Sequence, residues 1–499
     1  MTAAPPPALG TLTPHPDAAR RLRHALLANG YGDEGLAAPL RLRSLAGGAG
    51  PEIDWREIAG DGPLTGLVEL FVLGRPIDPE RARAALSPLS LHDAQRAGFV
   101  EPAGDGVVSP WEIMVHDGLL LLGDHPDRMT RGNVDFVGTI SNSARTLAFQ
   151  TSREPVAETL DLGTGSGVQA LLAARHSERV LGVDVNPRAT MIARVNGDLN
   201  ELSNIDYGVG DWFGAVAGER RFALVVANLP FVAAPQVVYR FAHGGLDPNE
   251  LSRRIVRGAA ARLADGGMAQ ILTSWTRRIA DERMAPVRDF VAGTGCDAVV
   301  LAHGMEEATG YAAEQCGWLA PGDRRRYGEL LRAWLRYYRE TGVEVVDYGL
   351  ISLRHSGGDA PWLHGIDTAR MPAAACGAHV ERLFAGNAAA ASLTDDELLG
   401  ARFALAAGHR VTQASRREPD GYHQEPTAIE LVPDVGYGAA VSAHATAALF
   451  SMTAQETLGQ TVARVAQETG LAQPALQDEA TGAMRNLLQL GMAELAHSA

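Results

Sequence analysis

Residues that can contact a ligand recur along the central part of the chain, each group at the end of an apolar, strand-like run. The stretch DLGTGSG (161–167) closes the first run, and Asp184 closes the second, RVLGVDV. Asp211 follows the third run, and NLPF (228–231) follows the fourth, FALVVA. Because parallel strands present their carboxyl ends at one edge of a sheet, we expect these groups to meet in a single site.

Three glycines of the first stretch, Gly163, Gly165 and Gly167, allow the backbone to turn sharply and to approach a bound ligand closely. Such a loop occurs in dinucleotide sites and also in plain strand-to-helix turns. Asp161 and Thr164 belong to the same stretch and are expected to line the ligand with the glycines. The residues at the later strand ends favour one kind of ligand.

Those later residues suit a nucleoside. Asp184 can accept hydrogen bonds from both ribose hydroxyls, and Val185 is expected beside it. Asp211 can accept from an adenine amino group, or it is an ordinary turn residue, while Trp212 or Phe213 can pack on the ring. Dinucleotide loops have the spacing G-x-G-x-x-G around a pyrophosphate, whereas this chain has G-x-G-x-G. The pattern therefore predicts a nucleoside that carries methionine and no pyrophosphate.

The stretch 228–231 suits a planar nitrogen acceptor. The Asn228 amide offers a donor and an acceptor, Pro230 stiffens the turn, and the Phe231 ring provides a face for stacking. Aligning a nitrogen lone pair with a sulfonium methyl group is mainly a matter of positioning. These three are the predicted catalytic residues, and Asn228 is also expected to border the cofactor. The alternative is a polar turn after a buried strand.

At this point the chain resembles a known family. DLGTGSG, GVDVNPRA, the stretch 210–231 and the later HGGLDP are similar to class I methyltransferases that modify the glutamine amide of peptide-release factors, and to their wider (D/N)PP(Y/F) relatives. The resemblance covers roughly residues 140–280. It implies S-adenosylmethionine as cofactor, with Asp184 at the ribose and Asp211 at the adenine. It further implies that Asn228 and the Pro230 region hold the acceptor nitrogen while Phe231 stacks on it.

The chain departs from this family at one motif position and in its flanking domains. The usual second motif residue is proline, where this chain has Leu229. NLP(Y/F) also occurs in enzymes that dimethylate adenine in ribosomal RNA, so nitrogen chemistry is still implied. The flanking domains resemble a group of actinobacterial proteins in which VDFVGTISNSARTLAFQT precedes the glycine loop. Within that segment, Gly138, Ser141 and Thr146 either contact the carboxylate end of the cofactor or form a structural turn and cap.

A histidine follows the predicted catalytic stretch. His243 opens HGGLDPNE (243–250), a segment suited to a mobile lid over the acceptor. The imidazole could accept a proton. A single loop histidine is more often solvated, and that is the expectation for His243.

The elements that position these residues alternate between strand-like and helical runs, which is typical of a doubly wound parallel sheet. The predicted fold is α/β, with a Rossmann-like class I methyltransferase domain over 129–358. Residues 16–128 favour helices followed by a small hairpin, a winged-helix-like accessory domain. Residues 359–499 favour an α+β accessory domain, and 1–15 a flexible tail rich in proline and alanine.

Finer predictions concern the second half of the chain. We expect a strong helix over 322–342 and a closing strand over 343–355. Residues 361–377 look like a loop, and 394–409 like a helix. Two amphipathic helices are expected near the end, over 453–470 and 479–495.

Composition limits the partners. The 499 residues suggest two to four domains, and a net charge of -15 disfavours a large phosphate-binding surface. Cys296, Cys316 and Cys376 lie too far apart for a metal site or a disulfide framework, so no metal and reduced thiols are predicted. The beginning of the chain lacks the features of a signal peptide, and no run has the roughly 18 apolar residues of a membrane helix. We expect a cytoplasmic protein without a membrane partner, and a homodimer is one assembly that the sequence allows.

The sequence thus predicts an S-adenosylmethionine-dependent N-methyltransferase that acts on an amide or amine of a protein, peptide or small metabolite. The nearest alternative is a base methyltransferase for RNA or DNA. A regulator that binds the cofactor without catalysis is a third possibility, and an O-methyltransferase a fourth. No Ser-His-Asp order, HExxH or CxxC supports a hydrolase or a metalloenzyme.

Overall fold

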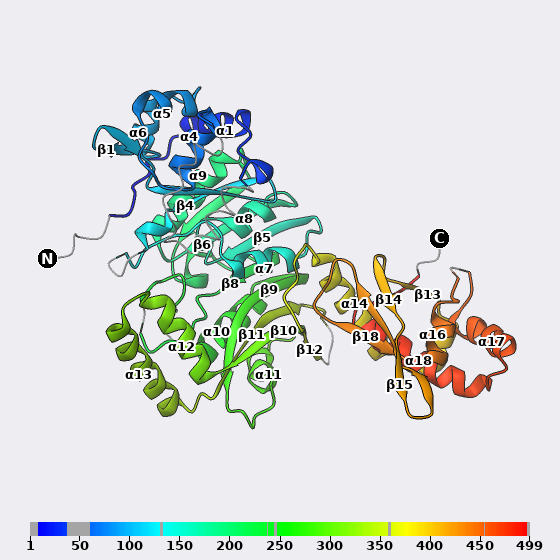
Figure 1. Cartoon of the computed structure of the whole chain (residues 1–499). Helices are drawn as coiled ribbons and strands as arrows, with labels where there is room; N and C mark the ends of the chain where they lie inside the picture. The colour runs from blue at the N-terminus through cyan, green and yellow to red at the C-terminus, as the bar shows by residue number, and fades with distance from the viewer. Residues whose placement is uncertain are drawn as a thin grey trace.

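An eight-stranded mixed sheet forms the centre of the molecule (Figure 1). The computed structural model describes residues 8–36, 60–129, 133–236, 238–243, 247–357, 361–453 and 455–496. In chain order the sheet contains β5 (Val156–Leu162), β6 (Ser177–Asp184), β7 (Ile205–Val209), β8 (Phe222–Asn228), β9 (Leu263–Arg277), β10 (Asp297–Glu307), β11 (Val345–Arg354) and β12 (Leu363–Asp367). Across the sheet their order is β12-β10-β11-β9-β8-β5-β6-β7.

The strand order confirms the predicted α/β, Rossmann-like architecture. Strands β7, β6, β5, β8 and β9 are parallel and have the 3-2-1-4-5 order of a doubly wound sheet. β11 lies between β9 and β10 and is antiparallel to both. The predicted closing strand is therefore present, but it lies inside the sheet, and the edge beyond it is formed by β10 and β12.

Helices cover both faces of this sheet. Leu251, Ile255 and Phe290 carry α10 (Pro248–Ala260) and α11 (Ala285–Val291) onto one face. On the other face lie α7 (Asn142–Gln150) and α14 (Gly377–Ser392). The remaining helices of the central region are α8 (Val168–Ala173), α9 (Pro187–Leu199), α12 (Ala308–Leu319) and α13 (Arg324–Thr341), the last of which confirms the strong helix predicted there.

The N-terminal region consists of helices followed by hairpins. Its described elements are α1 (Pro16–Ala28), α4 (Pro63–Phe71), α5 (Pro79–Leu86), α6 (Leu91–Ala97), β1 (Glu101–Ala103), β2 (Gly106–Val108), β3 (Trp111–His116) and β4 (Leu119–Asp124). Its apolar core is continuous with helix α9 of the central region, through Ile192, Val195 and Leu199. The region therefore does not bury its core alone, and it packs against the sheet through α9 (Figure 1).

Asn196 in α9 and Asn200 at the C-cap of that helix hydrogen-bond to the backbone of β4 in the way that a neighbouring strand would. Asn196 accepts from the backbone N–H of Leu122 at 2.8 Å and donates to the carbonyl of Leu122 at 2.8 Å. Asn200 makes the same pair of bonds with Leu120, at 2.9 and 2.7 Å. Since β4 would otherwise leave these buried backbone groups without partners, the two amides fix the hairpin on the helix.

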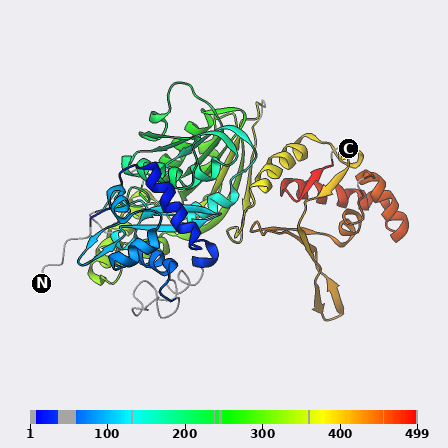
Figure 2. The same cartoon turned by 90° about the horizontal axis from the view of Figure 1, so that it is seen from above.

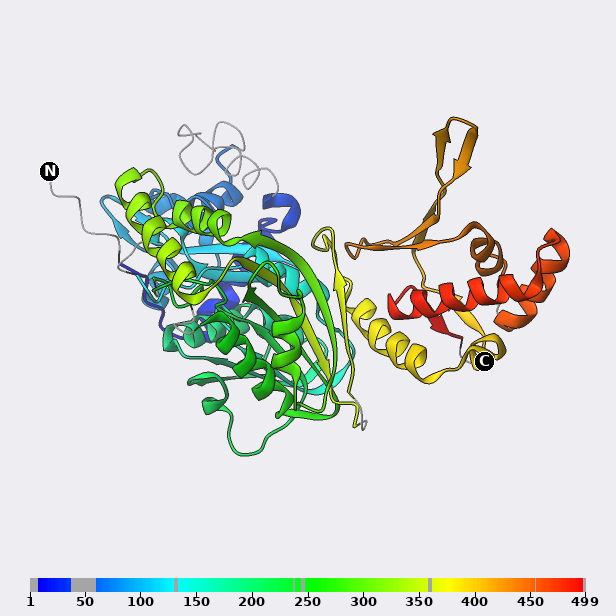
Figure 3. The same ribbon diagram turned by 90° about the horizontal axis from the view of Figure 1, so that it is seen from below.

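The C-terminal region has its own apolar core and lies beside the sheet domain (Figure 2). Besides α14 it contains α15 (Asp395–Gly400), β13 (Phe403–Leu405), β14 (His409–Thr412), β15 (Ser415–Glu418), β16 (Gly421–Gln424), β17 (Thr427–Leu431), β18 (Gly438–Val441), α16 (Ala443–Leu449), α17 (Leu458–Thr469), α18 (Gln473–Gln489) and β19 (Ala493–Leu495). The hairpin of β15 and β16 stands away from the rest of this region (Figure 3).

Two local predictions were wrong because long-range pairing overrides local preference. The segment 361–377, expected as a loop, contains β12, which pairs with β10 and lies beyond the predicted domain boundary at 358. The helix expected over 394–409 stops at Gly400, because Phe403 is drawn into the core on β13, paired with β19. Among the described helices, none combines the length and apolar character needed to cross a membrane.

The asparagine pairing generates a stability prediction. Replacing Asn196 with alanine leaves the buried N–H and C=O of Leu122 and the carbonyl of Ser166 without their partner. Unsatisfied buried groups of this kind cost about 1–3 kcal/mol each, so we expect a loss of about 3 kcal/mol in the free energy of unfolding. Urea denaturation followed by tryptophan fluorescence measures it. The exposed Asn142→Ala serves as control, and an equal, small effect in both variants would contradict the role given to Asn196.

Candidate active site

The glycine loop between β5 and α8 turns tightly, and it leaves open space beside two of its glycines. Gly163, Gly165 and Gly167 have φ of 71°, 56° and 91°, in the left-handed region that side chains disfavour. A Cβ on Gly167 would lie 3.0 Å from Ala193, so packing against α9 also requires that glycine. At Gly163 and Gly165 a Cβ would meet no protein atom closer than 3.9 Å. Their backbone is therefore accessible to a ligand.

Asp161 stabilises the conformation of the glycine loop through two hydrogen bonds. One of its carboxylate oxygens accepts from the Thr164 hydroxyl at 2.7 Å and from the N–H of Ala170 at 3.0 Å. The side chain is 1% exposed, and burial raises its pKa to about 7, with the nearby Asp184 charge adding to the shift. Asp161 and Thr164 thus shape the loop, and direct contact of either with the cofactor stays a prediction.

Asp184 joins the second strand to its neighbours. One carboxylate oxygen accepts from the N–H of Gly165 at 2.9 Å, and the other accepts from the N–H of Asn186 at 2.8 Å. Burial raises the pKa of Asp184, although its backbone hydrogen bonds oppose the shift. Each oxygen keeps a lone pair for a further donor, as ribose hydroxyls require. Val185 is 52% exposed, an apolar surface next to this carboxylate.

The third strand ends in a strained turn. The N–H of Gly210 donates to the carbonyl of Asp184 at 3.0 Å, which brings exposed Asp211 to the same edge of the sheet. Trp212 has φ of 48°, an uncommon conformation for an aromatic residue. The Phe213 ring fills the space beside Gly258 of α10, so it packs toward the core. Trp212 and Phe213 are both partly buried and pack against the same core cluster, so each remains a candidate for packing on a nucleobase.

Asn228 ends the fourth strand with half of its amide unpaired. Its Nδ2 donates to the Ser143 hydroxyl at 3.2 Å, whereas its Oδ1 is buried and has no hydrogen-bond partner among the described residues. Exchanging the two amide atoms does not change this conclusion, because a hydroxyl can donate or accept and one amide atom remains unpaired in either assignment. A buried polar group without a partner is costly, so the site is suited to a ligand that completes it.

Two hydrogen bonds from strand β9 fix the backbone of Leu229 and Phe231, which follow Asn228. Leu229 is buried with 3% exposure, and its N–H donates to the carbonyl of Leu272 at 3.2 Å. The Ser274 hydroxyl donates to the carbonyl of Phe231 at 2.6 Å. Phe231 itself is partly buried, as is Pro230, so each retains exposed surface at the strand end. The side chain that departs from the family motif, Leu229, faces the core rather than the acceptor.

His243 lies beside this loop and is not solvated. It forms a β-bridge with Phe231 and is only 3% exposed, so the expectation of an exposed loop histidine was wrong. Burial lowers the pKa of His243, which favours a neutral imidazole, and its Nε2 has no hydrogen-bond partner in the described part of the chain. The glycines of the predicted lid, 244–245, lie outside the described residues.

Other residues near the site serve the fold or were missed by sequence reasoning. The Ser141 hydroxyl caps α7, and the buried Thr146 hydroxyl donates to the carbonyl of Asn142 at 3.0 Å, which favours structural roles for both. Ser143 and Ser274, which contact Asn228 and Phe231, were not predicted. Ser143 lies in the segment already noted before the glycine loop, but no local signal indicated Ser274.

The central region matches a known family. Residues 138–290 match the family model described as methyltransferase small domain. Residues 138–290 form a methyltransferase domain. A second model, described as a domain of unknown function, matches residues 54–110. The predicted assignment to the class I, S-adenosylmethionine-dependent methyltransferases is confirmed for the methyltransferase domain.

Sequence relatives point to the same group. A release factor glutamine methyltransferase from Cereibacter sphaeroides is 37% identical over 128 residues, which are 23% of this chain and 45% of the relative. Its counterpart from Xylella fastidiosa is 31% identical over 168 residues, covering 31% of this chain and 58% of its own. The chain therefore spans about half the length of these relatives. A solved methyltransferase from Pyrococcus furiosus aligns with 43% of this chain and 82% of its own at 15% identity, with a TM-score of 0.27.

Asp184 gives a test of the cofactor site. Asp184→Ala removes the acceptors proposed for the ribose and frees Gly165, so the dissociation constant of S-adenosylhomocysteine should rise at least about tenfold, the equivalent of one charged hydrogen bond. Isothermal titration calorimetry measures it. Asp206→Ala, which removes an exposed carboxylate from the neighbouring strand β7, should leave affinity unchanged. Unaltered affinity in a folded Asp184→Ala protein would remove this residue from the site.

The raised pKa of Asp161 predicts that the stability of the protein depends on pH. Its pKa is about 7 in the folded protein and about 3.9 in the unfolded chain, so between these values the folded state holds a proton that the unfolded state has lost. Wild-type stability should therefore fall, relative to Asp161→Asn, as pH rises from 4 to about 7, and the difference should level off above that. Melting temperatures measured at successive pH values test this, and a difference that stays constant with pH would contradict it.

Proposed function

We propose that this protein transfers a methyl group from S-adenosylmethionine to the side-chain amide nitrogen of a protein glutamine. The observation that carries the proposal is the buried, unpaired amide atom of Asn228 at the carboxyl end of β8, next to the open glycine loop. An amide N–H of an acceptor is a donor of the kind this atom lacks. The names of the similar relatives, release factor glutamine methyltransferases, favour a protein glutamine over other nitrogen acceptors.

In this proposal one set of residues binds the cofactor and another binds the acceptor. When bound, S-adenosylmethionine supplies an electrophilic methyl group on a sulfonium. In this proposal Asp184 and Val185 would hold the ribose, and Trp212 and Asp211 would hold the adenine. Asn228 would hold the acceptor amide through its unpaired atom.

Positioning of Asn228 depends on its neighbours. The Ser143 hydroxyl fixes the orientation of the Asn228 amide, and the backbone of Phe231 is fixed by Ser274. An amide nitrogen is a weak nucleophile, so orienting its lone pair toward the methyl group is the contribution such a site can make. A preorganised hydrogen-bond partner needs no rearrangement during the reaction.

The departure of this chain from the family motif lies on the core side of the loop. Proline at the second motif position would lack the N–H with which Leu229 binds the Leu272 carbonyl. Leu229 keeps the loop fixed through that bond, while its side chain fills the core. The acceptor side of the motif, formed by Asn228, Pro230 and Phe231, is unaltered in chemical type.

One labelling experiment distinguishes a protein acceptor from a nucleic acid or small-molecule acceptor. The purified protein is incubated with a cell lysate and S-adenosylmethionine labelled on the methyl group, and protein, nucleic acid and small-molecule fractions are separated. The proposal expects label in protein and a methylated glutamine in its tryptic peptides by mass spectrometry. Label confined to methylated bases or to a metabolite would overturn the glutamine assignment and leave the methyltransferase domain intact.

Asn228 is tested with the acceptor so found. Asn228→Ala should lower the rate of methyl transfer by about 100-fold or more, since both orientation and a hydrogen bond are lost, while affinity for S-adenosylhomocysteine changes little. Phe231→Ala should lower the rate less, because stacking contributes about 1–2 kcal/mol. Asn142→Ala, an exposed asparagine at the start of α7, is the matched control. Full turnover by Asn228→Ala would make the motif a structural turn only.

A further inference from the structure

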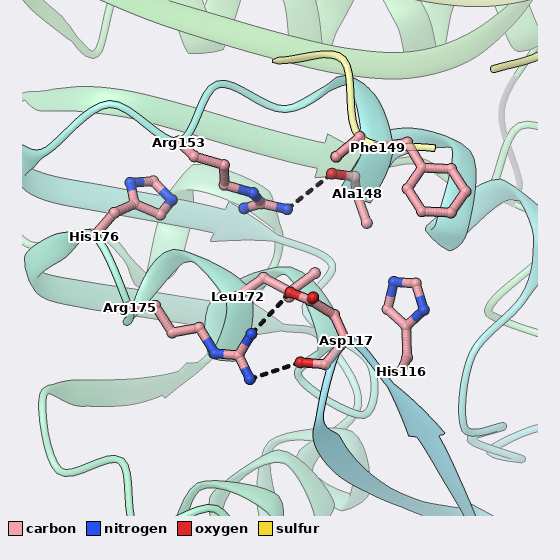
Figure 4. Close-up of a pocket in the computed structure, with 9 residues that line it drawn as sticks. His116, Asp117, Ala148, Phe149, Arg153, Leu172, Arg175 and His176 are labelled. Carbon is pink, nitrogen blue, oxygen red and sulfur yellow. Dashed lines mark hydrogen bonds and ion pairs between the residues drawn. The ribbon is translucent and has the colours of Figure 1, made fainter. Parts of the chain in front are cut away.

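A cavity of about 560 Å³ lies away from the residues assigned to the cofactor, where the N-terminal hairpin, two central helices and the linker to the C-terminal region meet. Its volume is in the range of small-molecule sites. It is lined by His116, Asp117, Ala148, Phe149, Arg153, Leu172, Arg175, His176 and Ala375 (Figure 4). None of these residues takes part in the proposed methyl transfer.

The cavity lies at the far end of the two helices that begin at the active site. Helix α7 starts near Ser143, which contacts Asn228, and ends at Gln150, next to Phe149 of the cavity. Helix α8 starts after Gly167 and ends at Ala173, next to Leu172 of the cavity. A ligand in this cavity therefore would not occupy the cofactor site.

Arg153 brings a positive charge to this cavity that forms no direct ion pair with the described residues, although the charge of Asp117 acts on it. Its Nη2 donates to the carbonyl of Ala148 at 2.9 Å, but its Nη1 is buried and has no hydrogen-bond partner among the residues that the structure describes. Among the described residues, no carboxylate lies within ion-pair distance of this guanidinium. The neighbouring Arg175 already pairs with Asp117, through the carboxylate at 2.8 Å and the backbone carbonyl at 2.8 Å (Figure 4).

Capping of α7 accounts for part of this arrangement. An arginine that donates to a carbonyl in the last turn of a helix compensates the negative end of the helix dipole. That role uses Nη2 and leaves Nη1 without a partner. Because a buried guanidinium is destabilising unless its charge and its N–H groups are satisfied, an anion is the missing component. Burial lowers the pKa of Arg153 to about 10, so it remains charged at neutral pH.

His176 adds a second unpaired group and Phe149 adds a ring. The Nδ1 of His176 lies 3.0 Å from the carbonyl of Glu154, to which it donates, and its Nε2 is buried and has no partner within the described part of the chain. Burial lowers the pKa of His176, so Nε2 is an acceptor for a hydroxyl or amine. The His116 and Phe149 rings lie 5.9 Å apart on the opposite side of the cavity (Figure 4). Together with Leu172 they form an apolar wall suited to a planar ring.

We propose that this cavity binds a small aromatic carboxylate that also carries a hydroxyl or amine group. The carboxylate pairs with Arg153, the hydroxyl or amine donates to Nε2 of His176, and the ring packs against Phe149 and Leu172. Arginine recognises carboxylates through paired hydrogen bonds, which gives the site a preference for the charged ligand over its neutral amide.

The test uses the full chain and the three isomers of hydroxybenzoate as probes, titrated by isothermal titration calorimetry. At least one isomer should bind saturably, and its neutral counterpart, the matching hydroxybenzamide, should bind at least tenfold more weakly. Arg153→Gln should weaken binding of the carboxylate by at least tenfold. Arg179→Gln removes the same charge from a side chain that is 69% exposed and paired with Glu158 outside the cavity, and it should bind as wild type does.

A second variant separates loss of the site from loss of the fold. Ala375→Phe fills the cavity from an exposed linker position without changing Arg153, and it should also abolish binding. Affinity for S-adenosylhomocysteine should be the same with and without the probe and in every variant. Equal binding of acid and amide, wild-type binding by Arg153→Gln and Ala375→Phe, or competition with S-adenosylhomocysteine would overturn the proposal. None of these measurements depends on methyl transfer.

Discussion

The hydrogen bonds of Asp184 are the interactions on which the rest of the site depends. One oxygen binds the N–H of Gly165 in the loop after β5, and the other binds the N–H of Asn186 at the start of α9. Its backbone carbonyl receives the N–H of Gly210 after β7. A single residue thus fixes the ends of three strands relative to one another. Because these bonds use one lone pair of each carboxylate oxygen, the carboxylate is oriented before any ligand arrives, which lowers the entropy lost on binding.

The same constraint reaches the N-terminal region through α9. Asn186 starts that helix, and Asn196 on its buried face donates to the carbonyl of Ser166 in the glycine loop as well as pairing with Leu122. Arg188 adds a charged pair with the buried carboxylate of Asp124 at the end of β4, which also accepts from the N–H of Val137. The N-terminal helices and hairpins are therefore attached to the cofactor loop by hydrogen bonds as well as by apolar packing. Because the N-terminal region shares its core with α9, it supports the sheet domain directly.

Local sequence was sufficient wherever a residue's role depends on its own strand end. The glycine spacing, Asp184, Asp211 and Asn228 all lie at the carboxyl edge, because the period of the strands and the parallel order bring them there. Sequence reasoning failed where a role depends on a distant segment. β12 is a strand only because the edge of β10 is available, and His243 is buried only because its segment returns to bridge Phe231. Ser274 contacts the motif from a neighbouring strand, and no local pattern distinguishes it from any other buried serine.

Recognition of the proposed acceptor depends on contacts from outside the four-residue motif. The side proposed for the cofactor is built from consecutive strand ends, so a short motif defines it well. The side proposed for the acceptor combines Asn228 with Ser143 on α7, Ser274 on β9 and His243 on a returning loop. Each of these partners is set by packing that lies outside the four-residue motif. A change from proline to leucine inside the motif therefore alters the core and one backbone hydrogen bond, whereas a change in any of these distant contacts would reorient the group proposed to hold the acceptor nitrogen.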